Sequence, residues 1–151
     1  FSISERKVIC GIEDVSWDEQ TIPVDNQAHK LFGSNEIKEI LRLVMKSEYK
    51  DNYFFYCWTS LYKKGEYINK HKDKDGDLQI LICLRNQTLK HDEGQIGLTY
   101  KGETRLIKLE PGDMFLFPAS KITHFTTPIK TINKLSKRHV RAVLVARFFF
   151  D

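Results

Sequence analysis

The residues whose types and spacing could do chemistry lie in the stretch GEYINKHKDKDGD, residues 65–77. His71 and Asp73 stand two apart, after a segment, 66–69, that its composition predicts as a strand. Because side chains alternate between the faces of an extended chain, His71 and Asp73 can point the same way. An imidazole and a carboxylate are two of the three ligands of a 2-His-1-carboxylate metal site. Most His-x-Asp tripeptides are surface charge, so this hypothesis needs a third ligand.

A third ligand would have to come from a distant strand. The other histidines are His29, His91, His124 and His139. Only His124 follows a turn and a buried-looking strand, in PGDMFLFPASKITHF (111–125). We therefore predict a metal site formed by His71, Asp73 and His124.

The last predicted strand, RAVLVARFFF (141–150), carries Arg141 and Arg147. They are six residues apart, so they lie on the same face of an otherwise apolar strand. Burying a guanidinium without a partner is costly. Each arginine therefore lies at an exposed edge, pairs with protein acids, or holds a carboxylate of a ligand, which its planar fork matches in two-point contact.

The elements that must position these residues are one helix and a series of short strands. SNEIKEILRLVMKSEY (34–49) predicts a helix, with Ser34 or Asn35 as its cap. Its apolar face comprises Ile37, Ile40, Leu41, Val44 and Met45. Segments rich in β-branched and aromatic residues predict strands at 53–62, 66–69, 78–85, 95–100, 104–109, 113–118, 124–129 and 141–150. We expect a hairpin at 101–103 and a tight turn at 110–113.

This pattern favours a mainly β, antiparallel jelly roll, which hides its sheet edges, with at least one N-terminal flanking helix. The 151 residues predict a single domain, 1–151, in which residues 1–52 support a jelly-roll core at 53–150. The sequence does not begin with Met, so we expect it to be either a trimmed chain or part of a longer protein.

Composition excludes little beyond disorder and a membrane-spanning helix. Hydrophobic residues make up 41% and charged residues 29%, and the net charge of +4 is only mildly basic. The three cysteines, Cys10, Cys57 and Cys83, have no metal-binding spacing, so we predict buried free thiols in a reducing, intracellular compartment, the cytoplasm by preference.

The order of these motifs resembles that of the iron(II)/2-oxoglutarate-dependent dioxygenases, prolyl-hydroxylase-like members included. LYKKGEYINKHKDK (61–74) resembles their signature that ends in His-x-Asp, and LQILICLRN (78–86) resembles their next core strand. DEGQIGLTY (92–100), PGDMFLFPASKITHFTTPI (111–129) and RAVLVARF (141–148) resemble their later segments. Gln95 and Arg147 depart from that pattern, because a glycine and a tryptophan are usual there.

This resemblance implies the double-stranded β-helix form of the jelly roll, with Fe(II) held by His71, Asp73 and His124. It also implies 2-oxoglutarate held by Arg141, with Tyr62 as a hydrogen-bond partner; Arg138 or Lys137 is a weaker choice for this clamp. The implied reaction is hydroxylation of a C–H bond in an amino acid, a peptidyl residue or a small metabolite. Dioxygen is consumed, succinate and CO2 are co-products, and ascorbate can act as a supporting reductant.

Three alternatives remain open at this point. The arginine spacing and HKDKDG also resemble the AlkB family of nucleic-acid demethylases, although Val143 and Val145 replace the Asn and Thr of its motif. PGDMFLFP (111–118) is cupin-like, but the usual His-x-His and its glutamate are missing. A non-enzymatic jelly-roll binding module would carry the His-x-Asp by coincidence.

Overall fold

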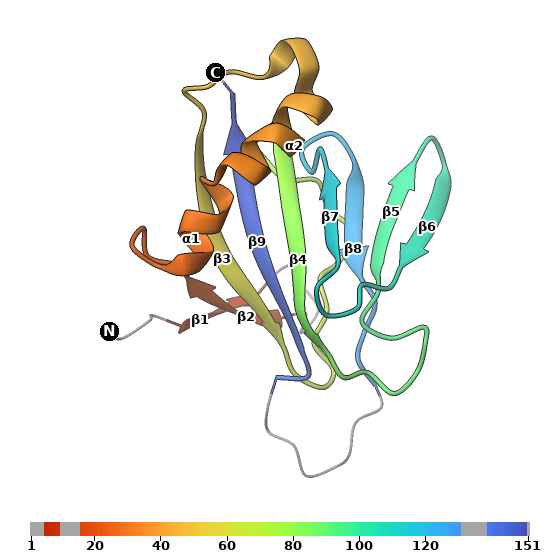
Figure 1. Cartoon of the computed structure of the whole chain (residues 1–151). Coiled ribbons are helices and arrows are strands. Elements are labelled where there is room, and N and C mark those ends of the chain that lie inside the picture. Colours follow the sequence, from red (N-terminus) through yellow and green to blue (C-terminus); the bar gives the residue numbers. More distant parts are fainter. Residues whose placement is uncertain (1–4, 10–15, 131–138, 151) are drawn as a thin grey trace.

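Two antiparallel sheets form the core of the protein (Figure 1). The computed structural model describes residues 5–9, 16–130 and 139–150. The larger sheet has the order β1 (Glu5–Ile9), β2 (Ser16–Thr21), β3 (Phe54–Tyr62), β9 (Arg141–Phe149), β4 (Leu78–Asn86), β7 (Met114–Phe117). The smaller sheet has the order β6 (Glu103–Ile107), β5 (Ile96–Tyr100), β8 (Thr123–Thr126). The predicted mainly β jelly roll with a flanking helix is confirmed.

The helices lie across one face of the larger sheet (Figure 1). They are α1 (Gln27–Phe32) and α2 (Asn35–Met45), the latter followed by the short 3-10 helix η1 (Lys46–Glu48). Ser34 caps α2, because its hydroxyl accepts a hydrogen bond from the Ile37 N–H. The predicted helix is confirmed, although its α-helical part ends at Met45. Val44 does not belong to the buried face and is 48% exposed, because Ile37 and Leu41, one turn apart, are the residues turned toward the sheet.

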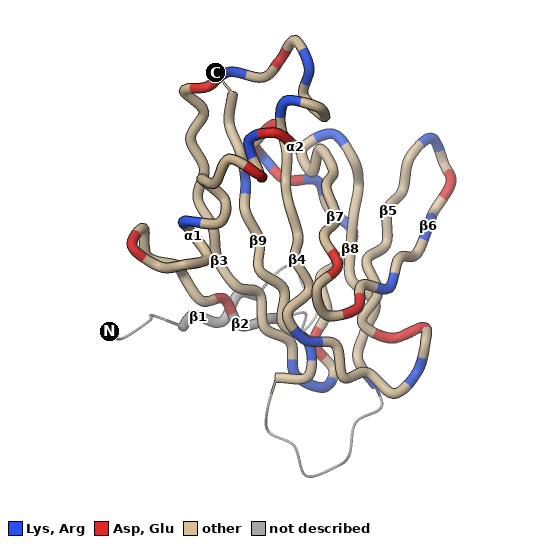
Figure 2. The backbone as a smooth tube through the Cα atoms, viewed as in Figure 1, with Lys and Arg blue, Asp and Glu red and all other residues tan. Residues whose placement is uncertain are grey.

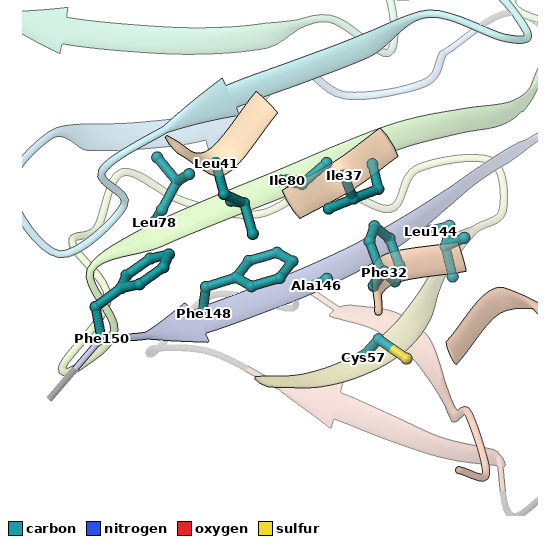
Figure 3. Packing of buried hydrophobic residues seen from close by; sticks show 10 residues of the cluster. All are labelled: Phe32, Ile37, Leu41, Cys57, Leu78, Ile80, Leu144, Ala146, Phe148 and Phe150. Atoms are coloured by element: carbon teal, nitrogen blue, oxygen red, sulfur yellow. The ribbon is translucent and has the colours of Figure 1, made fainter. Parts of the chain in front are cut away.

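Packing of these helices buries the outer face of the larger sheet. Figure 3 shows the side chains of α1 and α2 facing those of the strands. The buried members are Phe32, Ile37, Leu41, Cys57, Leu78, Ile80, Leu144, Ala146, Phe148 and Phe150. The inner face of the larger sheet packs separately against the smaller sheet, through a second cluster that includes Leu81, Ile96, Phe117, Val143 and Val145. Strand alternation thus gives β9 one apolar face for the helices and another for the space between the sheets.

Seven of the eight predicted strands are present, with small differences at their ends. The eighth, 66–69, is wrong as a strand. It is an irregular segment tied to β8 at Ile68, whose carbonyl accepts from the Thr126 N–H and whose N–H donates to the Thr126 hydroxyl. The glycine before it, Gly65, has a φ of +84°, and the Glu66 side chain accepts from the Lys63 N–H, so a turn replaces the start of the strand.

The N-terminal region contains elements for which its mixed sequence offered no pattern, namely β1, β2 and α1. Both predicted turns are present: Lys101 and Gly102 have positive φ in the β5–β6 hairpin, and Asp113 donates its N–H to the Glu110 carbonyl. Cys57 and Cys83 are buried free thiols as expected, whereas Cys10, Lys137 and Arg138 lie outside the described residues.

Acidic and basic residues are interspersed along the loops and the β5–β6 hairpin (Figure 2). This mixture agrees with the small net charge. Among the described residues, no helix combines the length and the apolar character that crossing a membrane would require.

Candidate metal and cofactor site

Two segments far apart in the sequence bring His71 and His124 together. An isolated antiparallel bridge pairs them: the His71 N–H donates to the His124 carbonyl at 3.0 Å, and the His124 N–H donates to the His71 carbonyl at 2.8 Å. Their rings are 4.2 Å apart between centroids. His124 lies on β8, whereas His71 lies in the irregular segment that precedes β4.

Backbone carbonyls orient both imidazoles. Nδ1 of His71 lies 2.7 Å from the carbonyl oxygen of Asn69, and Nδ1 of His124 lies 3.0 Å from that of Ile122. A carbonyl can only accept, so each Nδ1 carries a proton, and in the neutral ring each Nε2 is the nitrogen left to bind a metal. A partner of this kind on the second ring nitrogen is usual for histidines that bind metals.

Asp73 completes the group. Its Oδ1 lies 3.4 Å from Nε2 of His71 and 3.6 Å from Nε2 of His124. One ligand atom from each residue fits within 4.8 Å of the others, which allows all three to reach one ion. The Asp73 N–H donates to the Ala119 carbonyl at 3.0 Å, so this carboxylate is also fixed through its backbone.

The environment favours a charged carboxylate at the centre of this group. Burial raises the pKa of Asp73, but the hydrogen bond from His71 and the charge of Arg147 outweigh it, so the net pKa is lowered. Burial lowers the pKa of His71, yet its bonds to Asp73 and to the Asn69 carbonyl raise the net value. Burial lowers the pKa of His124, which is the more enclosed histidine. An anionic carboxylate beside two imidazoles is a donor set suited to Fe(II).

A cavity of about 1200 Å³ contains this group and continues between the sheets. Its lining includes all three residues of the group, together with apolar side chains of β4, β7 and β9. The cavity therefore has room for a cofactor and for part of a substrate beside a metal ion.

Arg141 lines the same cavity from the first position of β9. It is only 2% exposed, and its Nη1 has no hydrogen-bond partner. Its guanidinium carbon lies 4.7 Å from the ring centre of Tyr62, which stands opposite it on β3. Burial raises the pKa of Tyr62, which keeps the phenol protonated beside the cation. Among the described residues, no carboxylate forms an ion pair with Arg141.

Arg147 lies at the other end of β9, and the sequence assigned it no single role. Its Nη2 donates to Oδ2 of Asp73, and its Nη1 donates to Oδ1 of Asp75 at 2.9 Å and to the Tyr56 hydroxyl at 2.8 Å. The even spacing of the two arginines predicted a shared face, and both indeed line the cavity. Nothing in the sequence indicated that Arg147 would contact the carboxylate of the predicted metal site.

Comparison with solved structures identifies the fold. A 2OG-Fe(II) oxygenase family oxidoreductase from Burkholderia pseudomallei aligns with 99% of this chain and 75% of its own, at a TM-score of 0.75 and 14% identity. A Pseudomonas putida prolyl-4-hydroxylase aligns with 89% of this chain and 73% of its own, at a TM-score of 0.63 and 18% identity.

A viral collagen prolyl hydroxylase from Paramecium Bursaria Chlorella virus-1, solved with 2OG, aligns with 87% of this chain and 77% of its own. The TM-score is 0.65 and the identity 15%. The chain has the double-stranded β-helix fold. No family model matches the sequence, and no curated protein matches it. At these identities the likeness establishes the fold, and the chemistry has to be argued from the site.

Proposed function

We propose that this protein is an iron(II)- and 2-oxoglutarate-dependent oxygenase that hydroxylates a C–H bond of an amino acid, a peptidyl residue or a small metabolite. One observation carries the proposal: a single cavity holds a three-residue metal-ligand group and a buried arginine with an unpaired nitrogen. The double-stranded β-helix fold, shared with the solved oxygenases, supports it.

Fe(II) fits the donor set. His71 and His124 would bind it through Nε2, and Asp73 through Oδ1, because these atoms face one another while the other nitrogens and oxygen are engaged elsewhere. Three protein ligands on one face leave further positions of the metal for a cofactor and for dioxygen.

2-Oxoglutarate fits the other part of the cavity. Its distal carboxylate would pair with Arg141 and satisfy the unpaired Nη1, with Tyr62 beside it. Leaving that nitrogen buried without a partner is costly, whereas an Arg–carboxylate contact is among the strongest polar interactions. Apolar neighbours such as Leu81, Val143 and Val145 line the cavity and would exclude water from this ion pair.

When bound together, iron and 2-oxoglutarate supply the oxidation: one oxygen atom of dioxygen enters the substrate C–H bond, the other enters succinate, and CO2 leaves. The residues of this chain have the simpler tasks of binding and orientation. His71, Asp73 and His124 would hold the metal. Arg141 would bind the distal carboxylate and so orient the keto acid in the cavity.

Succinate release is the direct test. The protein, loaded anaerobically with Fe(II), is mixed with 2-oxoglutarate, ascorbate and a library of amino acids and peptides in air-saturated buffer, and succinate and products heavier by one oxygen are measured. We expect both signals from the wild type and neither from His124→Ala. A wild type that binds neither Fe(II) nor 2-oxoglutarate would leave the non-enzymatic binding module as the better description.

A specific observation favours a second candidate, the oxidative demethylation of alkylated nucleic acid. Rings of β3 and β9 stack beside the cavity: Phe54 and Phe149 are parallel at 4.5 Å, and Tyr56 and Trp58 are nearly so at 5.5 Å. Lys70, Lys72 and Lys74 line the same cavity. Stacked rings with cations are suited to bases and phosphates.

The small net charge and the neighbouring acids favour the hydroxylase over this candidate. Formaldehyde release from a methylated oligonucleotide decides between them. Binding that falls by about 0.7–0.9 log units per log unit of salt for each phosphate contacted would also support the demethylase.

A further inference from the structure

The segment 71–77 carries two of the three candidate metal ligands, yet it belongs to no helix or strand. Its position therefore depends on contacts with its neighbours. At its start the backbone pairs with β8 through His71, and at its end the Asp77 N–H donates to the Phe148 carbonyl of β9 at 2.9 Å. Between these anchors, the Ser120 hydroxyl donates to the Gly76 carbonyl at 2.7 Å.

Arg147 is the side chain on which this segment converges. Its guanidinium contacts Asp73 and Asp75 of the segment, Tyr56 of β3 and the Gln79 amide oxygen of β4, the last at 3.4 Å from Nε. The side chain is 16% exposed and that of Asp73 is 8% exposed, so this ion pair is largely shielded from water. In such a setting, losing one partner is far more costly than at the surface.

Gly76 adapts the segment to the stem of the same arginine. It has a φ of +86°, and a Cβ placed on it would lie 2.6 Å from Cγ and 2.7 Å from Cδ of Arg147. Only glycine lets the backbone lie this close to the stem. Three positions of the sequence HKDKDG thus accommodate Arg147: Asp73 and Asp75 pair with its guanidinium, and Gly76 leaves room for its stem.

The consequence concerns how Asp73 can bind a metal. Arg147 occupies Oδ2, which leaves Oδ1 to face the two histidine nitrogens at 3.4 and 3.6 Å. Without this contact the carboxylate could rotate and bind with both oxygens, which would fill a metal position that the cofactor or dioxygen needs. We propose that Arg147 is a positioning residue that keeps Asp73 a one-oxygen ligand. This inference rests on the proposed function, because it presumes a metal at the group.

Anaerobic titration with Co(II), followed by its visible absorption, tests this without any turnover. In Arg147→Met, which keeps the length of the stem but removes the donors, we expect the affinity for Co(II) to fall about 10- to 100-fold, with an altered spectrum. Arg147→Lys should recover part of the affinity, because it restores one charge near Oδ2. Arg105→Met, an exposed arginine of β6, is the matched control and should leave Co(II) binding unchanged.

Circular dichroism of the metal-free variants checks that each is folded. If Arg147→Met does not fold, Arg147→Lys and Asp75→Asn carry the test. Asp75 is 61% exposed. If Arg147 acts through its contact with Asp73, Asp75→Asn should weaken Co(II) binding less than twofold. Wild-type affinity and spectrum in Arg147→Met, or in Arg147→Lys where Met fails to fold, would overturn the inference. Absence of Co(II) binding to the wild type would instead overturn the proposed function.

Discussion

The two arginines of β9 face the same cavity and share the same strand, yet their surroundings differ in kind. Arg141 is 2% exposed, with an aromatic ring beside it and an unpaired Nη1. Arg147 donates to two carboxylates, a phenol and an amide, all from its own chain. A cation whose partners the fold provides is needed to keep those partners satisfied, whereas a buried cation without them is suited to an anion from outside.

The largest effect should follow from removing a member of the candidate metal-ligand group. His71→Ala, Asp73→Ala and His124→Ala should each abolish Fe(II) binding and turnover, because each removes one of three protein ligands. Asp73→Ala should also leave Arg147 with one carboxylate fewer, so it should lower stability more than His71→Ala does. Metal titration and thermal unfolding of the metal-free proteins measure both. A variant that keeps full Fe(II)-dependent activity removes its residue from the group.

Next in size is the loss of Arg141. Arg141→Met should raise the 2-oxoglutarate concentration needed for half-maximal activity by about 100-fold or more, since a buried carboxylate that loses its charged partner costs about 3–5 kcal/mol. Its affinity for Co(II) should stay close to that of the wild type. The matched variant Arg147→Met should show the reverse pattern. A larger 2-oxoglutarate effect at position 147 would mean that the carboxylate clamp is at the other end of β9.

The free energy of unfolding of the metal-free protein should distinguish the roles of the two arginines more clearly. Arg147→Met removes the arginine partner of the buried Asp73 carboxylate, so the free energy of unfolding should fall by about 3–5 kcal/mol. Arg141→Met replaces an incompletely satisfied cation by an apolar side chain of similar length, which should be neutral or stabilising by about 1–4 kcal/mol. Urea unfolding at neutral pH gives both values. Equal losses would show that Arg141 depends on a partner within the protein after all.

The smallest effect is expected at Gly76. Gly76→Ala and Gly112→Ala both place a side chain at positive φ, at +86° and +96°, and should share a strain of about 1–2 kcal/mol. Only at Gly76 would the new Cβ meet the Arg147 stem, and nothing lies within 4 Å of it at Gly112. Gly76→Ala should therefore destabilise by about 1–3 kcal/mol more, as overpacking does. In the Arg147→Ala background this excess should disappear.

Much of the fold follows from local pattern, because strand alternation, turn chemistry and helix capping are local properties. Segments such as 78–85 and 141–150 combine β-branched residues with other apolar or aromatic ones, and this composition predicts β4 and β9 almost to the residue. The misplaced strand at 66–69 shows the limit of this reasoning. Its composition is that of a strand, but it is tied to β8 through hydrogen bonds between Ile68 and Thr126, and the bridge to β8 is formed by His71, after the segment.

Of the candidate site, the sequence by itself determined the residue types: two histidines and an aspartate with the spacing of metal ligands, and two arginines on one face of a strand. Only the tertiary structure decided which arginine is already satisfied. Arg147 contacts Asp73 across 74 positions of sequence, and Arg141 meets Tyr62 through strand pairing. Such contacts depend on how β3, β9 and the segment 71–77 come together, and a guanidinium's role follows from its partners rather than from its place in the chain.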